Sequence, residues 1–227
     1  MNLKNWKEWA FIFMIIGCIQ FFILTILAMI FYAGGTGTDP NNPGYSFWSN
    51  FFSDTGRVKA WSGRNNTISY IIFTISLSII GISLIIFIIA FQRFFNIKKI
   101  EKILSIFGSI TGLISGILHV GIAFTPWDLY YDYHVMFVKL AFSSALLTAI
   151  LYTIVIFLNK EYPKQSMYVF LAFVFILGVY LGILFMGPNI NTTEGLTIQA
   201  TAQKIVDYSF ITCLLFQSYQ AWKFETS

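Results

Sequence analysis

Long apolar runs separated by short polar segments dominate the chain. Six runs of about 20 or more residues carry few charges, and they cover residues 10–33, 68–91, 103–124, 135–157, 167–186 and 202–222. A helix of about 20 residues crosses a hydrocarbon core of about 30 Å, and a helix satisfies its own backbone hydrogen bonds in lipid. The pattern therefore predicts an all-α membrane protein: a bundle of six transmembrane helices forming a single integral membrane domain over residues 1–227.

The first and last runs differ from the other four. The first covers about 24 residues, whereas the apolar part of a signal peptide covers about 7–15, so we expect an uncleaved first helix. The last run is the most polar, and a helix that begins one turn later is an open alternative there. It carries Lys204, Asp207, Gln217 and Gln220.

Composition supports a membrane setting. The chain is 57% hydrophobic and 11% charged, whereas soluble domains carry about 25% charged residues. Aromatic residues reach 19% and suit the interfacial belts of a bilayer. The net charge of +4 comes from basic residues between the apolar runs, which indicates topology and not nucleic-acid binding. Cys18 and Cys213 lie inside apolar runs, so we expect buried thiols and no disulfide.

Basic residues predict the orientation, because short cytoplasmic loops carry an excess of Lys and Arg. With the N-terminus inside, nine basic residues are cytoplasmic: Lys4, Lys7, Arg93, Lys98, Lys99, Lys102, Lys160, Lys164 and Lys223. Five are outside: Arg57, Lys59, Arg64, Lys139 and Lys204. This bias predicts a multi-pass protein of the plasma membrane with both termini in the cytoplasm.

The segment between the first two predicted helices, 34–67, is the longest polar segment of the chain. It opens with Gly, Thr, Pro and Asn, which are typical of turns, and continues into an aromatic stretch over 45–57. Asp54 is expected to accept hydrogen bonds in a turn, while Gly56 permits a positive φ and Arg57 lies close enough to neutralise the carboxylate. We therefore expect an ordered extracytoplasmic loop that caps a cavity.

Two predicted helices carry small-residue stripes. The first stripe consists of Gly108, Gly112 and Gly116, and the second of Gly178 and Gly182. Glycines four residues apart let helix backbones approach closely in lipid. Tight packing within the bundle is the main interpretation and homodimerisation through either stripe the alternative, so the chain is expected to be a monomer or a homodimer.

Ionisable residues gather toward the predicted outer side and allow three interpretations. In the first they are structural: Lys204 or Lys139 pairs with Asp207, and Asp128 caps a loop. In the second they bind a ligand, and membrane lipids are the expected partner because Lys and Arg suit phosphate groups. The ligand-binding candidates are Asn50, Ser53, Asp54, Arg57, Asp128, Lys139, Lys204 and Asp207.

The third interpretation is a metal-dependent intramembrane hydrolase. Two histidines and a carboxylate with an open position form a catalytic zinc pattern, and such a metal activates water. His119 and His134 are the metal candidates, together with Asp54 or with Asp128 or Asp132, and the catalytic candidates are His119, His134 and Asp132. The main expectation is nevertheless a protein without a cofactor. A small-solute permease gated by Lys139 and Asp207 is a further alternative.

Short motifs in the first and third outer loops resemble those of domain of unknown function 998, an uncharacterised prokaryotic family of membrane proteins. The residues that carry the resemblance are Asn50, Ser53, Asp54, Gly56, Arg57, Gly63, Ser69, Asp128 and His134. The resemblance extends over nearly the whole chain through the six-helix layout, and it implies a six-helix membrane protein without assigning a reaction.

Two further resemblances bear on function. The Ser53–Gly56 step is similar to one in the Frag, DRAM and Sfk group, which implies a role in lipid organisation, although the Pro and Glu usual after that step are missing here. The spacing of Ser115 and His119 is similar to that in the metal hydrolases related to ceramidases, which usually have seven helices and a late pair of histidines. Taken together, the sequence favours a non-enzymatic, lipid-interacting membrane protein.

Overall fold

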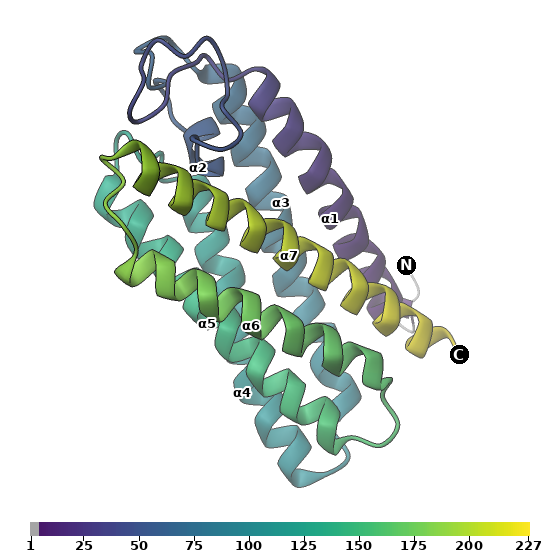
Figure 1. Cartoon of the computed structure of the whole chain (residues 1–227). Helices are drawn as coiled ribbons and strands as arrows, with labels where there is room; N and C mark the ends of the chain where they lie inside the picture. The colour runs from purple at the N-terminus through teal and green to yellow at the C-terminus, as the bar shows by residue number, and fades with distance from the viewer. Residues whose placement is uncertain (1–4) are drawn as a thin grey trace.

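The computed structural model describes residues 5–227 as an all-helical protein (Figure 1). The elements are α1 (Trp6–Ile30), α2 (Phe52–Thr55), α3 (Thr67–Phe91), the 3-10 helix η2 (Gln92–Phe95), α4 (Lys99–Ala123), α5 (Tyr131–Leu158), α6 (Lys164–Met186) and α7 (Thr193–Thr226). These residues contain no β-strand, and a single antiparallel bridge joins Lys59 to Asn65.

The six long helices form a closed ring in chain order. Each packs against its neighbours in the sequence, and α7 closes the ring by packing against both α6 and α1 (Figure 1). One end of the bundle, here called the loop end, carries residues 31–66 with α2 and the α4–α5 and α6–α7 connections. The opposite end, the terminal end, carries both termini and the other two connections. Short connections explain the antiparallel order from α3 to α7.

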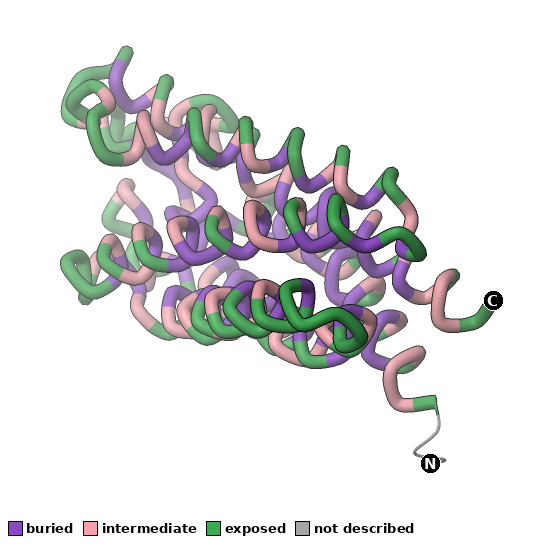
Figure 2. The backbone as a smooth tube through the Cα atoms, turned by 90° about the horizontal axis from the view of Figure 1, so that it is seen from below, coloured by how far each residue is buried: buried purple, intermediate pink, exposed green. Residues whose placement is uncertain are grey.

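Five helices are long and apolar enough to cross a membrane, namely α1, α3, α4, α5 and α6. Buried positions face the interior of the ring and exposed positions face outward (Figure 2). The outward positions are themselves hydrophobic, as at Ile75, Ile82 and Ile89 along α3, each more than 40% exposed. Soluble monomers rarely expose apolar surface of this extent, so the chain has the surface of an integral membrane protein.

The predicted helix ranges agree with the structure to within four residues at each end, except at the start of α7. This helix begins nine residues before the predicted 202 and ends four residues after the predicted 222. Its start is fixed by Thr192, whose side-chain oxygen accepts a hydrogen bond from the Gly195 nitrogen at 3.1 Å. The first three turns are polar, so hydropathy alone does not include them. The short α2 and η2 were not predicted.

The first glycine stripe lies within the bundle. Gly108 faces α5 side chains, and Gly112 lies between Ile88 of α3 and Thr148 of α5. Gly116 approaches α3 so closely that an added Cβ would lie 3.0 Å from the Gly81 carbonyl oxygen. The first stripe therefore packs tightly within the bundle, as predicted. The second stripe differs, since a Cβ added at Gly178 or Gly182 would meet no atom within 4 Å. Dimerisation through that open face stays a prediction.

Substituting Gly81 by alanine is expected to destabilise the protein. The new Cβ would lie 2.8 Å from the Gly116 carbonyl oxygen, and backbone cannot move aside as a side chain can. Overpacking of this kind costs about 1–3 kcal/mol, so thermal unfolding in detergent should occur at a lower temperature. Gly178→Ala is the matched control, because it fills open space and gains helix propensity. Equal unfolding temperatures for the two variants would contradict the assigned α3–α4 contact.

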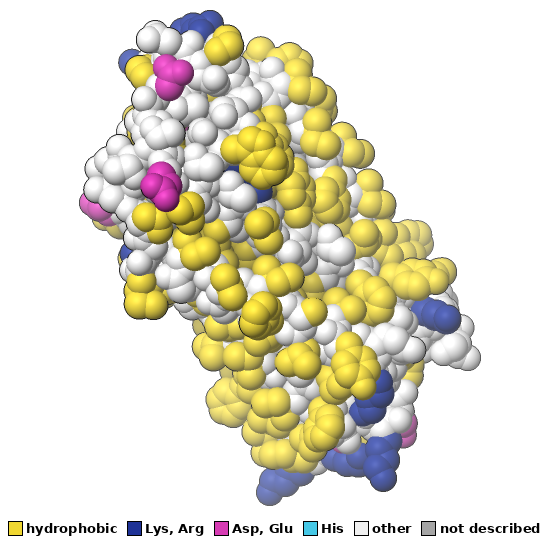
Figure 3. All heavy atoms as spheres, in the orientation of Figure 1, with side chains coloured by type: hydrophobic (Ala, Val, Ile, Leu, Met, Phe, Trp, Pro, Cys, Tyr) yellow, Lys and Arg dark blue, Asp and Glu magenta, His cyan; other side chains and the backbone are white. Residues whose placement is uncertain are grey.

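Basic side chains cluster at the terminal end (Figure 3). Lys7 forms an ion pair with Glu225 at 2.6 Å, which joins α1 to α7, and Lys98 pairs with Glu101 at 2.9 Å. Glu101 also accepts a hydrogen bond from Asn159 at 2.8 Å, joining α4 to the end of α5. Lys4, one of the residues predicted to be cytoplasmic, lies outside the described residues.

Candidate ligand-binding site

Asp54 organises the loop between α1 and α3. One carboxylate oxygen accepts hydrogen bonds from the Phe51 nitrogen and the Asn50 side chain, both at 2.9 Å, and the other accepts one from the Trp61 indole at 2.8 Å. The residue is fully buried. Burial raises the pKa of the Asp54 carboxyl above its ordinary value, while these hydrogen bonds and the charge of Arg57 oppose the shift.

The other loop residues of the motif have structural roles as well. The Asn50 side chain donates to the Gly35 carbonyl at 3.0 Å, and Ser69 donates to the Ala28 carbonyl at 2.8 Å. Gly56 does not adopt the expected positive φ, since its φ is −86°. Close packing requires a glycine there instead, because a Cβ would clash with the Phe73 ring. The motif therefore specifies the fold of the loop.

Arg57 and Asp128 attach the loop to the α4–α5 connection. The Asp128 carboxylate accepts hydrogen bonds from the Val58 and Lys59 nitrogens at 3.1 and 2.9 Å. The Arg57 guanidinium lies 4.0 Å from the centre of the Trp61 ring and 5.2 Å from that of Trp127. The expected contact between Arg57 and Asp54 is not an ion pair, because the guanidinium stacks on the indole rings.

Gln203 and Lys204 attach the loop to α7. The Gln203 side-chain oxygen accepts a hydrogen bond from the Phe52 nitrogen at 2.9 Å. Lys204 is 2% exposed and donates to the Asn50 and Ala200 carbonyl oxygens. Three aromatic rings surround its ammonium group, with ring centres 5.2 to 5.8 Å away; they belong to Tyr45, Phe47 and Phe52. Lys204 thus makes structural contacts in place of the expected pair with Asp207.

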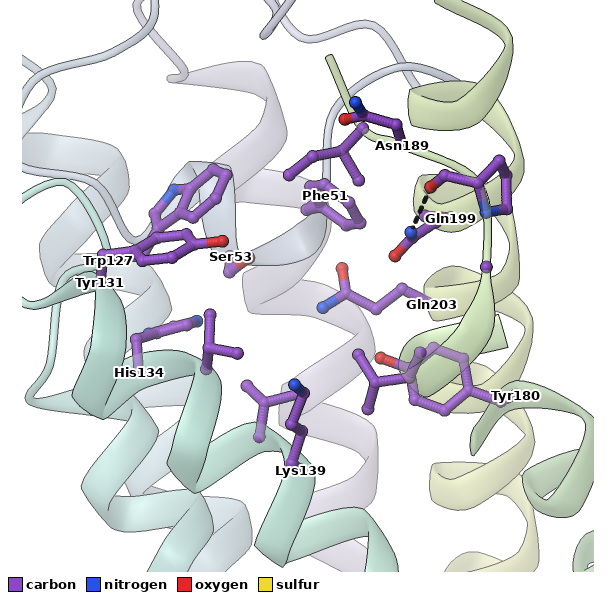
Figure 4. Close-up of a pocket in the computed structure, with 16 residues that line it drawn as sticks. Phe51, Ser53, Trp127, Tyr131, His134, Lys139, Tyr180, Asn189, Gln199 and Gln203 are labelled. Carbon is purple, nitrogen blue, oxygen red and sulfur yellow. Dashed lines mark hydrogen bonds between the residues drawn. The ribbon is translucent and has the colours of Figure 1, made fainter. Parts of the chain in front are cut away.

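A cavity of about 320 Å³ opens beneath the loop, between α5, α6, α7 and α2. We call it the loop-end cavity. Polar groups of His134, Lys139, Tyr180 and Gln203 point toward its centre (Figure 4). The remaining wall combines aromatic residues, among them Phe51 and Trp127, with aliphatic and small residues.

The existing hydrogen bonds of Gln203 and His134 determine which donor or acceptor each side chain leaves free for a ligand. Since the Gln203 oxygen accepts from Phe52, the amide nitrogen is left to donate into the cavity. His134 Nδ1 lies 2.7 Å from the Thr125 carbonyl oxygen, which only accepts, so Nδ1 carries the hydrogen and Nε2 carries a lone pair. That Nε2 is buried and has no hydrogen-bond partner among the described residues. The Trp127 indole nitrogen is likewise unpartnered.

A smaller space of about 40 Å³, here called the inner chamber, lies next to the loop-end cavity. The two share four lining residues, namely Ser53, Val138, His134 and Gln203, and the chamber adds His119 and Asp207. Ser53 is the one polar motif residue whose side chain makes no hydrogen bond to the described protein. Ser53 therefore belongs to the loop motif and also lines both the loop-end cavity and the inner chamber.

Several predicted pairings do not form. No described ion pair joins Lys139 or Lys204 to Asp207. The carboxylates proposed to join the histidines lie elsewhere: Asp54 and Asp128 bind the loop, and Asp132 is exposed on the first turn of α5. Residues 5–227 contain no group of three His, Cys, Asp or Glu side chains placed to hold a metal ion. Zinc binding stays a prediction.

Sequence reasoning overlooked Gln203, Tyr180 and Trp127. Gln203, one position before Lys204, is polar enough to stand out in an apolar run, as Gln217 and Gln220 do. Tyr180 and Trp127 gave no comparable indication, because aromatic residues are abundant throughout the chain.

Comparisons with known proteins leave the chain without an assigned relative: no family model matches it, and neither does any curated protein or solved structure.

Proposed function

We propose that the chain is a six-span protein of the plasma membrane that binds a lipid head group in the loop-end cavity. The sixth span is α7, which lies in the ring between α1 and α6. Its polar residues Gln203, Lys204 and Gln217 are buried, which explains its low hydropathy. The basic terminal end is placed in the cytoplasm by the positive-inside rule, so the loop end is extracytoplasmic.

The observation that carries lipid binding is the position of Lys139. This half-buried residue lines the loop-end cavity and also a groove on the outward face of α5 and α6. The groove walls are mostly apolar, with Met136, Leu140 and Phe185, and they also include Asp132. One cation thus lies where a polar cavity meets an apolar groove, which matches an amphipathic ligand entering sideways from the bilayer.

The charge balance favours an anionic head group. Lys139 has no ion pair in the described structure, and its ammonium group lies over the Phe185 ring at 5.3 Å. The Gln203 amide and the Tyr180 hydroxyl point into the same space (Figure 4). A phosphate accepts from all three, and hydrogen bonds to charged groups contribute about 1.5–3 kcal/mol.

Lys139→Ala is expected to weaken lipid retention roughly tenfold to a hundredfold, which corresponds to the loss of one charged hydrogen bond. Native mass spectrometry of the detergent-purified protein, with added anionic and zwitterionic lipids, measures the bound fraction directly. Lys59→Ala is the matched control, because it removes an exposed cation from the same end of the bundle. Equal lipid binding by Lys139→Ala and the wild type would refute the proposed site.

The same spectra bear on the other proposals. A bound divalent metal that disappears in His119→Ala or His134→Ala would favour the hydrolase. Absence of both lipid and metal would direct attention to the permease and to flux assays. Membership of the family with domain of unknown function 998 is also a proposal, and the structural roles of Asn50, Asp54 and Gly56 support it.

A further inference from the structure

Asp207 is the ionisable group that lipid binding leaves unexplained. It lies 14 residues into α7, about 21 Å from the start of the helix at 1.5 Å per residue. No described hydrogen bond or ion pair involves its carboxylate. Lys204, on the same helix, instead points to the loop. Asp207 is partly exposed and lines the inner chamber. A charged carboxylate among apolar helices is unfavourable unless a cation or a proton accompanies it.

The inner chamber around Asp207 is rich in hydrogen-bond acceptors. His134 Nε2 carries a free lone pair, as described above. His119 Nδ1 lies 2.8 Å from the Ser115 carbonyl oxygen, so its Nε2 is also an acceptor. The remaining walls are mostly apolar, with Phe21 from α1, Phe73 and Leu77 from α3 and Phe142 from α5.

The size and geometry of the chamber favour a proton over a larger cation. About 40 Å³ holds a water molecule or two. His119 lies on α4 beside Phe210, with ring centres 5.3 Å apart, whereas the His134 ring turns toward Thr125 at the loop end. The described residues bring no three ligands to one metal position.

Access to the chamber is from the loop end. Ser53, His134 and Gln203 line both the chamber and the loop-end cavity, so they form the neck between the two spaces. Toward the terminal end the interior is filled by aromatic side chains, including Phe91, Tyr152 and Phe170. A proton therefore reaches the chamber through the neck.

We propose that the inner chamber is a proton-binding site in which the Asp207 carboxylate takes up a proton from the loop-end cavity. One O–H bond forms at the carboxylate and one breaks in a hydronium ion in the neck, so the charge of the chamber changes from −1 to 0. The titratable groups near Asp207 are Tyr45 from the loop, His119 from α4, His134 from α5, Tyr180 from α6, and Lys204 and Tyr208 from α7. The residues of α1 and α3 that line the chamber are apolar.

Infrared spectroscopy of the full-length protein in lipid nanodiscs tests this site. At neutral pH we expect the C=O stretching band of a protonated carboxyl group, and Asp207→Asn should lose that band. Asp207→Glu should retain it at a shifted frequency, which keeps the test valid if the asparagine variant folds poorly. Asp132→Asn, which alters an exposed carboxylate, should leave the band unchanged.

The route is tested by transfer into D₂O. The band should shift promptly in the wild type and slowly in Val138→Trp, because Val138 lines both spaces and the larger ring would fill the neck. Lys139→Ala should leave the band in place, so failure of lipid binding and failure of the proton site are distinguishable. A wild-type spectrum without the band, a band of unchanged intensity in Asp207→Asn, or a metal bound in equal amount to the protein and lost in Asp207→Asn would each overturn the proposal.

Discussion

The Asp54→Ala variant is expected to lose the ordered loop and about 2–5 kcal/mol of stability. Two partly buried donors, the Phe51 nitrogen and the Trp61 indole, would have no acceptor in the protein, and each such loss costs up to about 1–3 kcal/mol. Asn50 would keep its bond to the Gly35 carbonyl but lose the one to Asp54. A large fall in the unfolding temperature in detergent, with faster tryptic cleavage after Arg57, would be the measured result.

Asp39→Ala is the control for this substitution. Asp39 belongs to the same loop but is exposed, and its carboxylate accepts a single hydrogen bond, from the Asn41 nitrogen at 3.0 Å. Its loss should change the unfolding temperature little. If Asp54→Ala behaved like Asp39→Ala, the loop would not depend on the Asp54 hydrogen bonds.

Lys204→Ala is expected to have a comparable effect, because Lys204 holds the loop against α7. The substitution removes the donor to the Asn50 carbonyl and leaves a gap among three aromatic rings. Large-to-small changes at buried positions cost about 2–5 kcal/mol. Thermal unfolding and proteolysis of the loop should both report the loss.

A further variant, Lys204→Met, separates the effect of charge from that of packing at this position. Lys204→Met retains most of the volume and removes the charge, and replacing a buried charge by an apolar group of similar size is often close to neutral. We therefore expect Lys204→Met to be clearly more stable than Lys204→Ala. Lys223→Ala, on the exposed face of the same helix, is the control and should resemble the wild type. A methionine variant as unstable as the alanine variant would show that the ammonium group itself holds the loop.

The loop motif has a structural role in place of most of the binding roles expected from the sequence. Asp54 and Gly56 predicted a structured turn, and the structure has one around Asp54. Asn50 and Asp54 were also candidates for ligand binding, yet their polar groups are already used within the loop. Ser53 is left, with Lys139 on another helix, to face the cavity. The sequence therefore located the polar motif correctly, but it predicted ligand binding for residues whose polar groups stabilise the loop.

Hydropathy failed at α7 for a related reason. A helix that places Gln203, Lys204 and Gln217 inside the bundle has a low mean hydropathy, although its outward face includes apolar residues such as Ile205. Averaging along the chain cannot separate an inward polar face from an outward apolar one. Only the closure of the ring by α7 against α1 and α6 shows where those side chains lie.

The sequence by itself determined the all-helical architecture, the order of the apolar helices and the location of the polar loop, because runs of apolar residues and turn-forming residues act locally. It also identified the polar residues that a bilayer makes costly to bury. The tertiary structure alone decided which of those residues meet. Gln203 contacts the loop, Asp207 lines the same chamber as the histidines, and Lys139 lies between the cavity and the groove, because helices distant in sequence pack side by side. Such pairings depend on the shapes of many side chains at once.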